Sequence, residues 1–325
     1  VLLPAVVLVQ LCQSQRSTPT TLHAAASAAE PERAIADAMM LEPRAFLRTL
    51  LQPQDPQDFF VADWEQRPRH LSRSPLVYEG LLDTATGAVE RLLEGCVSAG
   101  EVRGGALQAG LDMTFVKDGK QPRLPGHPDI RADQVAQGLG FGYSVVLNWV
   151  QYRSTAVAQL TEAFEASLGF RASVNMYHTP GSGSVAFAPH YDWNDVFVLQ
   201  INGSKAWSVW EPVVALPRSD ELRIQDEQLK AALGAPTMNL VLTPGDILYL
   251  PRGYPHAARN LQQETSTHLT VAVHAYVYET VEGFLQRAAA QWLSIAVPAT
   301  KRRSPLRRQL RVLEKRMFSL GTSDV

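Results

Sequence analysis

Six short runs of β-prone residues follow one another in the second half of the chain, and they constrain its fold more than any other feature. They cover residues 172–177, 196–201, 206–210, 239–242, 247–250 and 269–278. Such a succession is typical of a sheet that closes on itself, since each strand buries one face. The only long helical pattern among them is an insertion at residues 220–233. We therefore expect a mainly β protein with a barrel core and flanking α-helices.

One turn in this region has a strong local signal. Asn202 and Gly203 lie between two of the β-runs, and the Asn-Gly pair is typical of a two-residue hairpin turn because both central residues need positive φ. We predict a hairpin here, with Lys205 early on its second strand.

Helical patterns flank the barrel on both sides. Residues 35–51 predict one or two short helices, and a longer helix is expected to begin near Ser154 and end at Gly169. We divide the chain into residues 1–35, a disordered or targeting segment; 36–140, a helical and mixed part of the catalytic region; 141–278, the barrel; and 279–325, a helical segment with a basic tail. Residues 281–295 are a possible homodimerisation helix.

Charge and hydropathy exclude some classes of partner. The formal net charge of the 325 residues is −2, so we expect no direct binding to nucleic acid. We expect no transmembrane helix, because the apolar run at residues 1–11 is too short to span a bilayer. Together with the small residues at 24–29, that run resembles the end of an organelle or secretory targeting peptide within residues 1–30.

A metal-binding pattern stands among the β-runs. His190 and Asp192 are separated by one residue, so in an extended chain both side chains point to the same face. Downstream, the turn Pro244-Gly245-Asp246, an apolar strand and a second turn lead to His256. Two imidazoles and one carboxylate form the facial triad of Fe(II) oxygenases, which leaves positions for 2-oxoglutarate and O2. The other histidines are expected outside the triad, with His268 and His274 in the core or behind the site.

A cation and two polar residues complete the candidate site. Lys205 begins a strand that is otherwise apolar, and a salt bridge to the distal carboxylate of 2-oxoglutarate would satisfy its charge inside a barrel. Arg153 and Arg259 are the next candidates for this role. Asn175 and Tyr177 share one face of the preceding strand and are expected to bind the cofactor or substrate.

These motifs together resemble the JmjC domains of the cupin-4 group, which includes the ribosomal oxygenases. The resemblance rests on residues 174–180, the His190-to-Asp192 motif, residues 197–207, the segment from Pro244 to His256 and residues 266–270. It implies a double-stranded β-helix with iron at the triad and 2-oxoglutarate at Lys205. It also implies a protein hydroxylase whose substrate is a histidyl or arginyl side chain of a ribosomal protein, and a nuclear or nucleolar location.

Some positions depart from the pattern of the family, and they concern the substrate. Residues 147–154 stand where histidyl-hydroxylating relatives have a Gln-Pro-Gln-like element, and Trp193 stands where many have an acidic residue. We expect Trp193 to line the substrate entrance, and Ser266 matches a position near the substrate in relatives.

Other functions remain open at this stage. The same iron and cofactor residues would serve a JmjC lysine demethylase of histones or other proteins, or an oxygenase of a small molecule. A cupin-fold binding scaffold without turnover is the non-enzyme alternative. A cupin metalloenzyme such as an isomerase would use the iron without 2-oxoglutarate, and Lys205 discriminates against it.

Overall fold

The computed structural model describes residues 34–39, 43–81, 107–118, 120–121, 129–181, 187–217, 226–261 and 264–275. All of them lie in one compact unit of the chain, residues 33–325. The predicted targeting segment at 1–30, the dimerisation helix at 281–295 and the basic tail lie outside the described residues. Among the helices of the described part, none is both long and apolar enough to cross a membrane.

Two antiparallel sheets form the core of the described structure. The larger has seven strands in the order β1-β8-β5-β10-β4-β3-β2, and the smaller has three in the order β7-β6-β9. The bounds of the larger sheet's strands are Arg69–Leu71 (β1), Met113–Val116 (β2), Ser144–Leu147 (β3), Ala172–Thr179 (β4), Asp195–Asn202 (β5), Ile247–Leu250 (β8) and Ser266–Val273 (β10). The bounds in the smaller sheet are Lys205–Val209 (β6), Met238–Leu242 (β7) and His256–Asn260 (β9).

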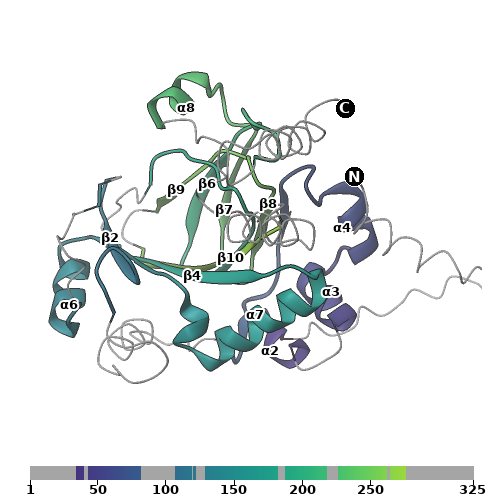
Figure 1. The fold of residues 1–325 in the computed structure, drawn as a ribbon, viewed down its shortest axis with the longest axis horizontal. Coiled ribbons are helices and arrows are strands. Elements are labelled where there is room, and N and C mark those ends of the chain that lie inside the picture. Colours follow the sequence, from purple (N-terminus) through teal and green to yellow (C-terminus); the bar gives the residue numbers. More distant parts are fainter. Residues whose placement is uncertain are drawn as a thin grey trace, which may run out of the picture. The chain divides into compact units, whose positions relative to one another are not determined.

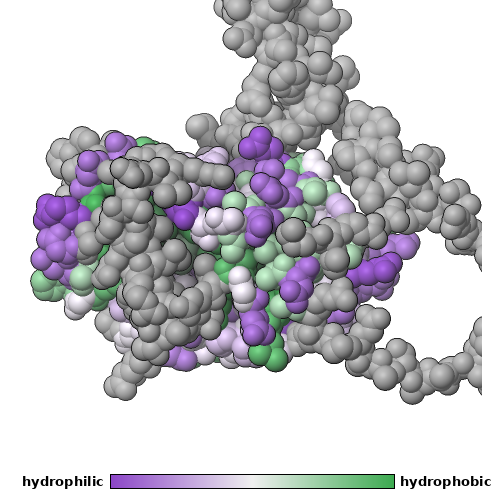
Figure 2. All heavy atoms as spheres, turned by 90° about the horizontal axis from the view of Figure 1, so that it is seen from below, coloured by the Kyte–Doolittle hydropathy of each residue, from purple (hydrophilic) through white to green (hydrophobic). Residues whose placement is uncertain are grey.

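Helices cover one face of the larger sheet, and the smaller sheet lies on its other side (Figure 1). Helix α7 (Thr155–Leu168) packs on β4 and on α3 (Pro43–Leu51), through side chains such as Phe164 and Phe46. The other helices among the described residues are α2 (Ile35–Ala38), α4 (Pro56–Ala62), α6 (Ala132–Gly140) and α8 (Asp226–Ala232), with short 3-10 turns at Pro75–Tyr78 and Val150–Tyr152. On this helical side, hydrophilic and hydrophobic residues are interspersed at the described surface (Figure 2).

The alternation of side chains along β5 divides the interior into two cores. Phe197, Leu199 and Ile201 face the helices, whereas Val196 and Val198 face the smaller sheet, where they pack with Trp207. Gln200 is on the same face as the second set and is fully buried. The space between the sheets is therefore lined by both apolar and polar side chains, as expected for the interior of a double-stranded β-helix that binds a ligand.

The six predicted runs correspond to β4, β5, β6, β7, β8 and β10, and the mainly β class is confirmed. The helix predicted after Ser154 is also confirmed: the Ser154 hydroxyl caps it at Val157 N, and Gly169 ends it with φ +75°. Strand β9 was missed because its sequence, His-Ala-Ala-Arg-Asn, has little β propensity. Its partners in the sheet determine its conformation.

The hairpin predicted at Asn202-Gly203 is wrong. Strand β5 pairs with β8 and β10, whereas β6 pairs with β7 and β9, so the turn carries the chain from one sheet to the other. Of the two turn residues, Asn202 and Gly203, only Gly203 has positive φ, at +58°. The local signal for a tight turn was right, but the strands on its two sides find different partners because each sheet buries a different face.

Candidate metal centre

Backbone pairing places the two candidate histidines side by side. The N–H of His190 donates to the carbonyl of His256 at 3.1 Å, and the N–H of His256 donates to the carbonyl of His190 at 2.8 Å. This isolated bridge extends the smaller sheet beyond β9. The two imidazole centroids are consequently only 4.5 Å apart.

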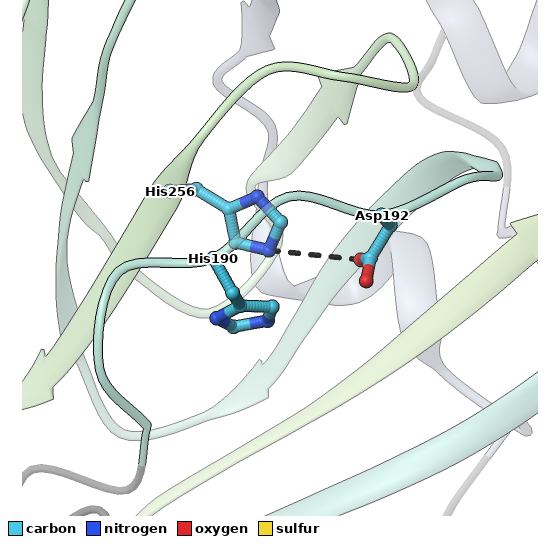
Figure 3. A group of neighbouring side chains, drawn as sticks. All are labelled: His190, Asp192 and His256. Carbon is cyan, nitrogen blue, oxygen red and sulfur yellow. Dashed lines mark ion pairs between the residues drawn. The ribbon is translucent and has the colours of Figure 1, made fainter. Parts of the chain in front are cut away.

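The ligand atoms of His190, Asp192 and His256 converge on one point (Figure 3), where they lie within 4.8 Å of one another. The Nε2 atom of His256 is 3.7 Å from an Asp192 carboxylate oxygen. His256 is buried, whereas the Asp192 side chain is 35% exposed, so the group opens on one side. The predicted triad is therefore assembled by the fold, with one face left accessible to further ligands.

Hydrogen bonds from the Nδ1 side of each ring fix the tautomer of the two histidines. The Nδ1 atom of His190 is 2.9 Å from the carbonyl of Ala188, and that of His256 is 3.0 Å from the carbonyl of Tyr254. Because a carbonyl oxygen only accepts, each Nδ1 carries the proton and each Nε2 presents a lone pair. This is how metal-binding histidines are oriented in proteins, so the residues present fit a divalent ion.

Lys205 crosses the interior between the two sheets. It begins β6 in the smaller sheet, is 2% exposed, and its Nζ donates to the Thr179 hydroxyl on β4 at 3.2 Å. Among the described residues, no carboxylate forms an ion pair with it. Burial lowers the pKa of Lys205 from 10.5 to about 7. An ammonium held in this way is suited to an anionic ligand.

The register of the smaller sheet sets the distance between Lys205 and the metal ligands. Val209 of β6 is opposite His256, and Lys205 is opposite Asn260, four residues along the strand. Four residues of strand span about 13 Å. The candidate ligand His256 and the ammonium-bearing Lys205 therefore lie on neighbouring strands, separated along their length.

Tyr177 and Asn175 line the same interior, as predicted from their spacing on β4. The Tyr177 ring stacks on His268 with centroids 4.8 Å apart and an interplanar angle of 3°. Burial and the charge of Asp192 raise the pKa of Tyr177 to about 12, so its hydroxyl keeps its proton at neutral pH. Asn175 accepts a hydrogen bond from the backbone N–H of Trp149 at 3.1 Å. Their roles toward a ligand stay predictions.

The remaining predicted residues lie in different settings. Ser266 is fully buried, accepts a hydrogen bond from Gln200 at 3.0 Å and is opposite Thr179, at the Lys205 end of the interior. Trp193 is half-buried beside Asp192. Their contact with a substrate stays a prediction. Of the alternative cations, Arg259 is exposed, and Arg153 lies 4.0 Å from Asp112.

One interior residue, Thr179, had no assigned role in the sequence, and the structure defines the surroundings of a second, His268. Thr179 continues the alternation of Asn175 and Tyr177 on β4 two residues beyond the predicted run, and this alternation is the signal that could have found it. His268 was expected in the core or behind the site, and the structure places its ring against Tyr177 and edge-on to Trp207 at 5.5 Å. Burial is the larger cause and the charge of Lys205 the smaller cause that hold the pKa of His268 well below 6.5. The His268 ring is therefore neutral at pH 7.

Comparison with known proteins agrees with this geometry. Residues 147–281 match the family described as the JmjC domain, a range that contains the triad and Lys205. Residues 147–281 form a JmjC domain. The crystal structure of ycfD from Escherichia coli is 20% identical and superposes with a TM-score of 0.50, covering 83% of this chain and 68% of that one. The JmjC domain and the mainly β, double-stranded fold are thus both confirmed.

Two curated relatives extend the match beyond the JmjC domain. Ribosomal oxygenase 1 of Gallus gallus is 32% identical over 257 residues, which cover 77% of this chain and 40% of the relative. The bifunctional lysine-specific demethylase and histidyl-hydroxylase NO66 of Drosophila persimilis is 37% identical over 171 residues, covering 50% of this chain and 23% of the relative. The chain therefore spans less than half the length of either relative.

Proposed function

We propose that this chain is an Fe(II)- and 2-oxoglutarate-dependent dioxygenase that hydroxylates a protein side chain, with a histidyl or arginyl residue of a ribosomal protein as the substrate. The observation that carries the proposal is the pair of Nδ1–carbonyl bonds, which aim two Nε2 lone pairs and the Asp192 carboxylate at one point. The relative named ribosomal oxygenase supports the substrate class.

The roles of the residues follow from their places in the fold. His190, Asp192 and His256 would hold the iron, and Lys205 with Thr179 would bind the distal carboxylate of 2-oxoglutarate. When bound, iron and 2-oxoglutarate supply oxidising chemistry in which one atom of O2 enters a substrate C–H bond, while the other enters succinate as CO2 leaves. Tyr177 keeps its proton and can donate a hydrogen bond to the ligand beside it.

The buried ammonium is what favours a 2-oxoglutarate enzyme over a cupin isomerase or a binding scaffold. A lone buried charge lowers stability, so it is explained best by a ligand that offsets the loss. An isomerase that needs only the metal gives no reason for it. The scaffold alternative gives no reason for the oriented pair of histidines either.

A lysine demethylase is the second candidate, supported by the Drosophila relative, which is named as both a lysine-specific demethylase and a histidyl-hydroxylase. The two activities share the metal and cofactor residues and differ in the bond that is oxidised. Hydroxylation of an N-methyl group releases formaldehyde, whereas hydroxylation of a side-chain carbon leaves a stable product. The products therefore separate the two candidates.

The test is anaerobic reconstitution of the purified chain with Fe(II), then measurement of succinate when O2 and 2-oxoglutarate are added, with and without a ribosomal-protein extract. We expect the extract to stimulate succinate formation and to gain a product heavier by about 16 Da, the mass of one oxygen atom. Formaldehyde with loss of methyl groups from a methylated histone would favour the demethylase. Absence of iron-dependent succinate under every condition would sink the proposal, with His190→Ala as the matched inactive control.

A further inference from the structure

A buried polar network lies outside the triad and joins three segments of the chain. The Tyr249 hydroxyl of β8 donates to Asp195 at the start of β5 at 2.7 Å, and its oxygen accepts the backbone N–H of Glu65, after α4, at 2.9 Å. Glu65 in turn forms an ion pair with Arg252, with Oε1 and Nη2 2.8 Å apart. Through this network the N-terminal helical layer reaches the core of the barrel.

The same network touches both segments that carry metal ligands. The positive charge of Arg252 acts on the Asp195 carboxylate and opposes the rise of its pKa, and the N–H of Gly253 donates to the carbonyl of Asp192 at 2.9 Å. Asp195 follows Asp192 by three residues, and His256 follows Arg252 by four. The Gly253–Asp192 bond therefore joins the turn that carries Asp192 to the turn that leads to His256, and Asp195 and Arg252 interact electrostatically beside it.

The network is held at an energetic cost. Asp195 is fully buried, and burial together with the charge of Glu65 raises its pKa to about 7. Glu65 has a φ of +56°, a left-handed conformation that is unfavourable for a non-glycine residue. Apolar residues of similar volume would commonly be as stable as buried ions, or more so. Cost of this kind, next to a binding site, points to a role beyond stability.

We propose that Glu65, Asp195 and Arg252 are positioning residues of the metal centre, which hold the Asp192 turn and the 251–255 turn at the separation that binds the ion. The inference rests on the metal site of the proposed function, and it adds that the N-terminal layer sets metal affinity through Glu65. None of the three residues coordinates the ion. They act through the backbones of Asp192 and of the segment before His256.

Titration of the metal-free full chain with Co(II) alone tests this inference. The variants are Asp195→Asn, which keeps size and removes charge, and Glu65→Gln, which breaks only the ion pair with Arg252. Asp133→Asn is the matched control, because Asp133 is an exposed carboxylate paired with Arg131 on α6. The readouts are the Co(II) dissociation constant, the visible Co(II) spectrum and the unfolding midpoint of the metal-free protein.

We expect Asp195→Asn to weaken Co(II) binding roughly 10–100-fold, as is usual for the groups that support metal ligands. Glu65→Gln should weaken it in the same direction, with an altered spectrum, and Asp133→Asn should not. The double variant Glu65→Gln with Arg252→Gln should bind no more weakly than Arg252→Gln alone, because Glu65 acts through Arg252. If Asp195→Asn does not fold, the Co(II) affinity of Glu65→Gln decides whether the positioning role is correct. The Glu65 side chain is partly exposed, so this substitution should leave the protein folded.

Wild-type affinity and spectrum in the folded variants would overturn the positioning role and leave the proposed function standing. If the wild type binds Co(II) through His190 but forms no succinate with Fe(II), the oxygenase proposal fails and the positioning role stands. A wild-type chain that binds no Co(II) removes both.

Discussion

His190 and His256 are joined through their backbones, with each N–H donating to the carbonyl of the other at 3.1 and 2.8 Å. The side chains take no part in this pairing, so their proximity depends on the chain fold rather than on an ion. The metal centre is consequently organised in advance of binding, since both rings are already oriented by bonds to Ala188 and Tyr254.

It follows that His190→Ala should remove metal binding and leave the fold intact. The backbone bridge persists in the variant, and only one half-buried ring is lost. We expect loss of Co(II) binding and of turnover, with a circular dichroism spectrum like that of the wild type. His274→Ala is the control, because His274 is not one of the candidate ligands. It follows the end of β10 and lies about 20 Å along that strand from His268, the histidine of β10 that faces the interior. Retained Co(II) binding in His190→Ala would contradict the ligand assignment.

Lys205→Met should stabilise the ligand-free protein and abolish 2-oxoglutarate binding. The pKa of Lys205 in the fold is below its unfolded value, so the folded state binds this proton less tightly. Burying the charged Lys205 therefore lowers the free energy of unfolding of the wild type. This destabilisation is fully present below about pH 7 and disappears as pH rises toward about 10.5. We expect a gain of roughly 1–3 kcal/mol at about pH 6 by denaturant unfolding, and little gain near pH 10.

The control for this variant is Lys230→Met, because Lys230 is exposed on α8. It should change the free energy of unfolding by less than about 0.5 kcal/mol at either pH. Equal stability of Lys205→Met and the wild type at about pH 6 would show that Lys205 is compensated in the fold, and the argument for an anionic ligand would lose its basis.

The affinity for 2-oxoglutarate should depend on pH through the same residue. Lys205 has a pKa of about 7, so above this pH it must take up a proton before it can pair with a carboxylate. The dissociation constant should be constant below about pH 7 and rise up to tenfold per pH unit above it. Calorimetry at about pH 8 in two buffers of different ionisation enthalpy should detect proton uptake. In Lys205→Arg the dependence should vanish, because arginine does not titrate in this range.

Thr179→Val should weaken 2-oxoglutarate binding less than Lys205→Met does. Valine matches the shape of threonine but removes the hydroxyl that accepts from Lys205 Nζ and from the Ser144 hydroxyl. The lost hydrogen bond is worth about 1–3 kcal/mol when the partner is charged, so we expect roughly a 5- to 100-fold rise in the dissociation constant. An unchanged constant would place the distal carboxylate elsewhere.

The sequence predicted that His190 and Asp192 lie close together because their spacing is a local signal. The His-x-Asp spacing puts His190 and Asp192 on one face of an extended segment, and Asn175, Tyr177 and Thr179 alternate on one strand. What brings Lys205 to Thr179, or Asp195 to Arg252, is strand order, and strand order depends on contacts between residues far apart in the sequence. The polar network of Glu65 and Asp195 had no local signal, so it was missed.

The turn at Gly203 shows the same division between local and long-range information. Its positive φ follows from the Asn-Gly pair, but its role in linking two sheets does not. A Cβ placed at Gly203 would lie 1.8 Å from the carbonyl oxygen of Thr265, in the segment that enters β10. The glycine is needed for this close approach of two backbones as well as for its φ.

Gly203→Ala should therefore be more destabilising than Gly169→Ala. Both glycines have positive φ, at +58° and +75°, but a Cβ at Gly169 meets nothing within 4 Å. Gly169→Ala should lower the free energy of unfolding by about 1 kcal/mol, the conformational cost alone. Gly203→Ala should lower it by more than about 3 kcal/mol, because two backbones must separate at the Lys205 end of the site. Denaturant unfolding of the two variants compares these costs directly. Equal losses would mean that the turn moves away from Thr265 freely. The turn that connects β5 to β6 would then not fix the position of Lys205.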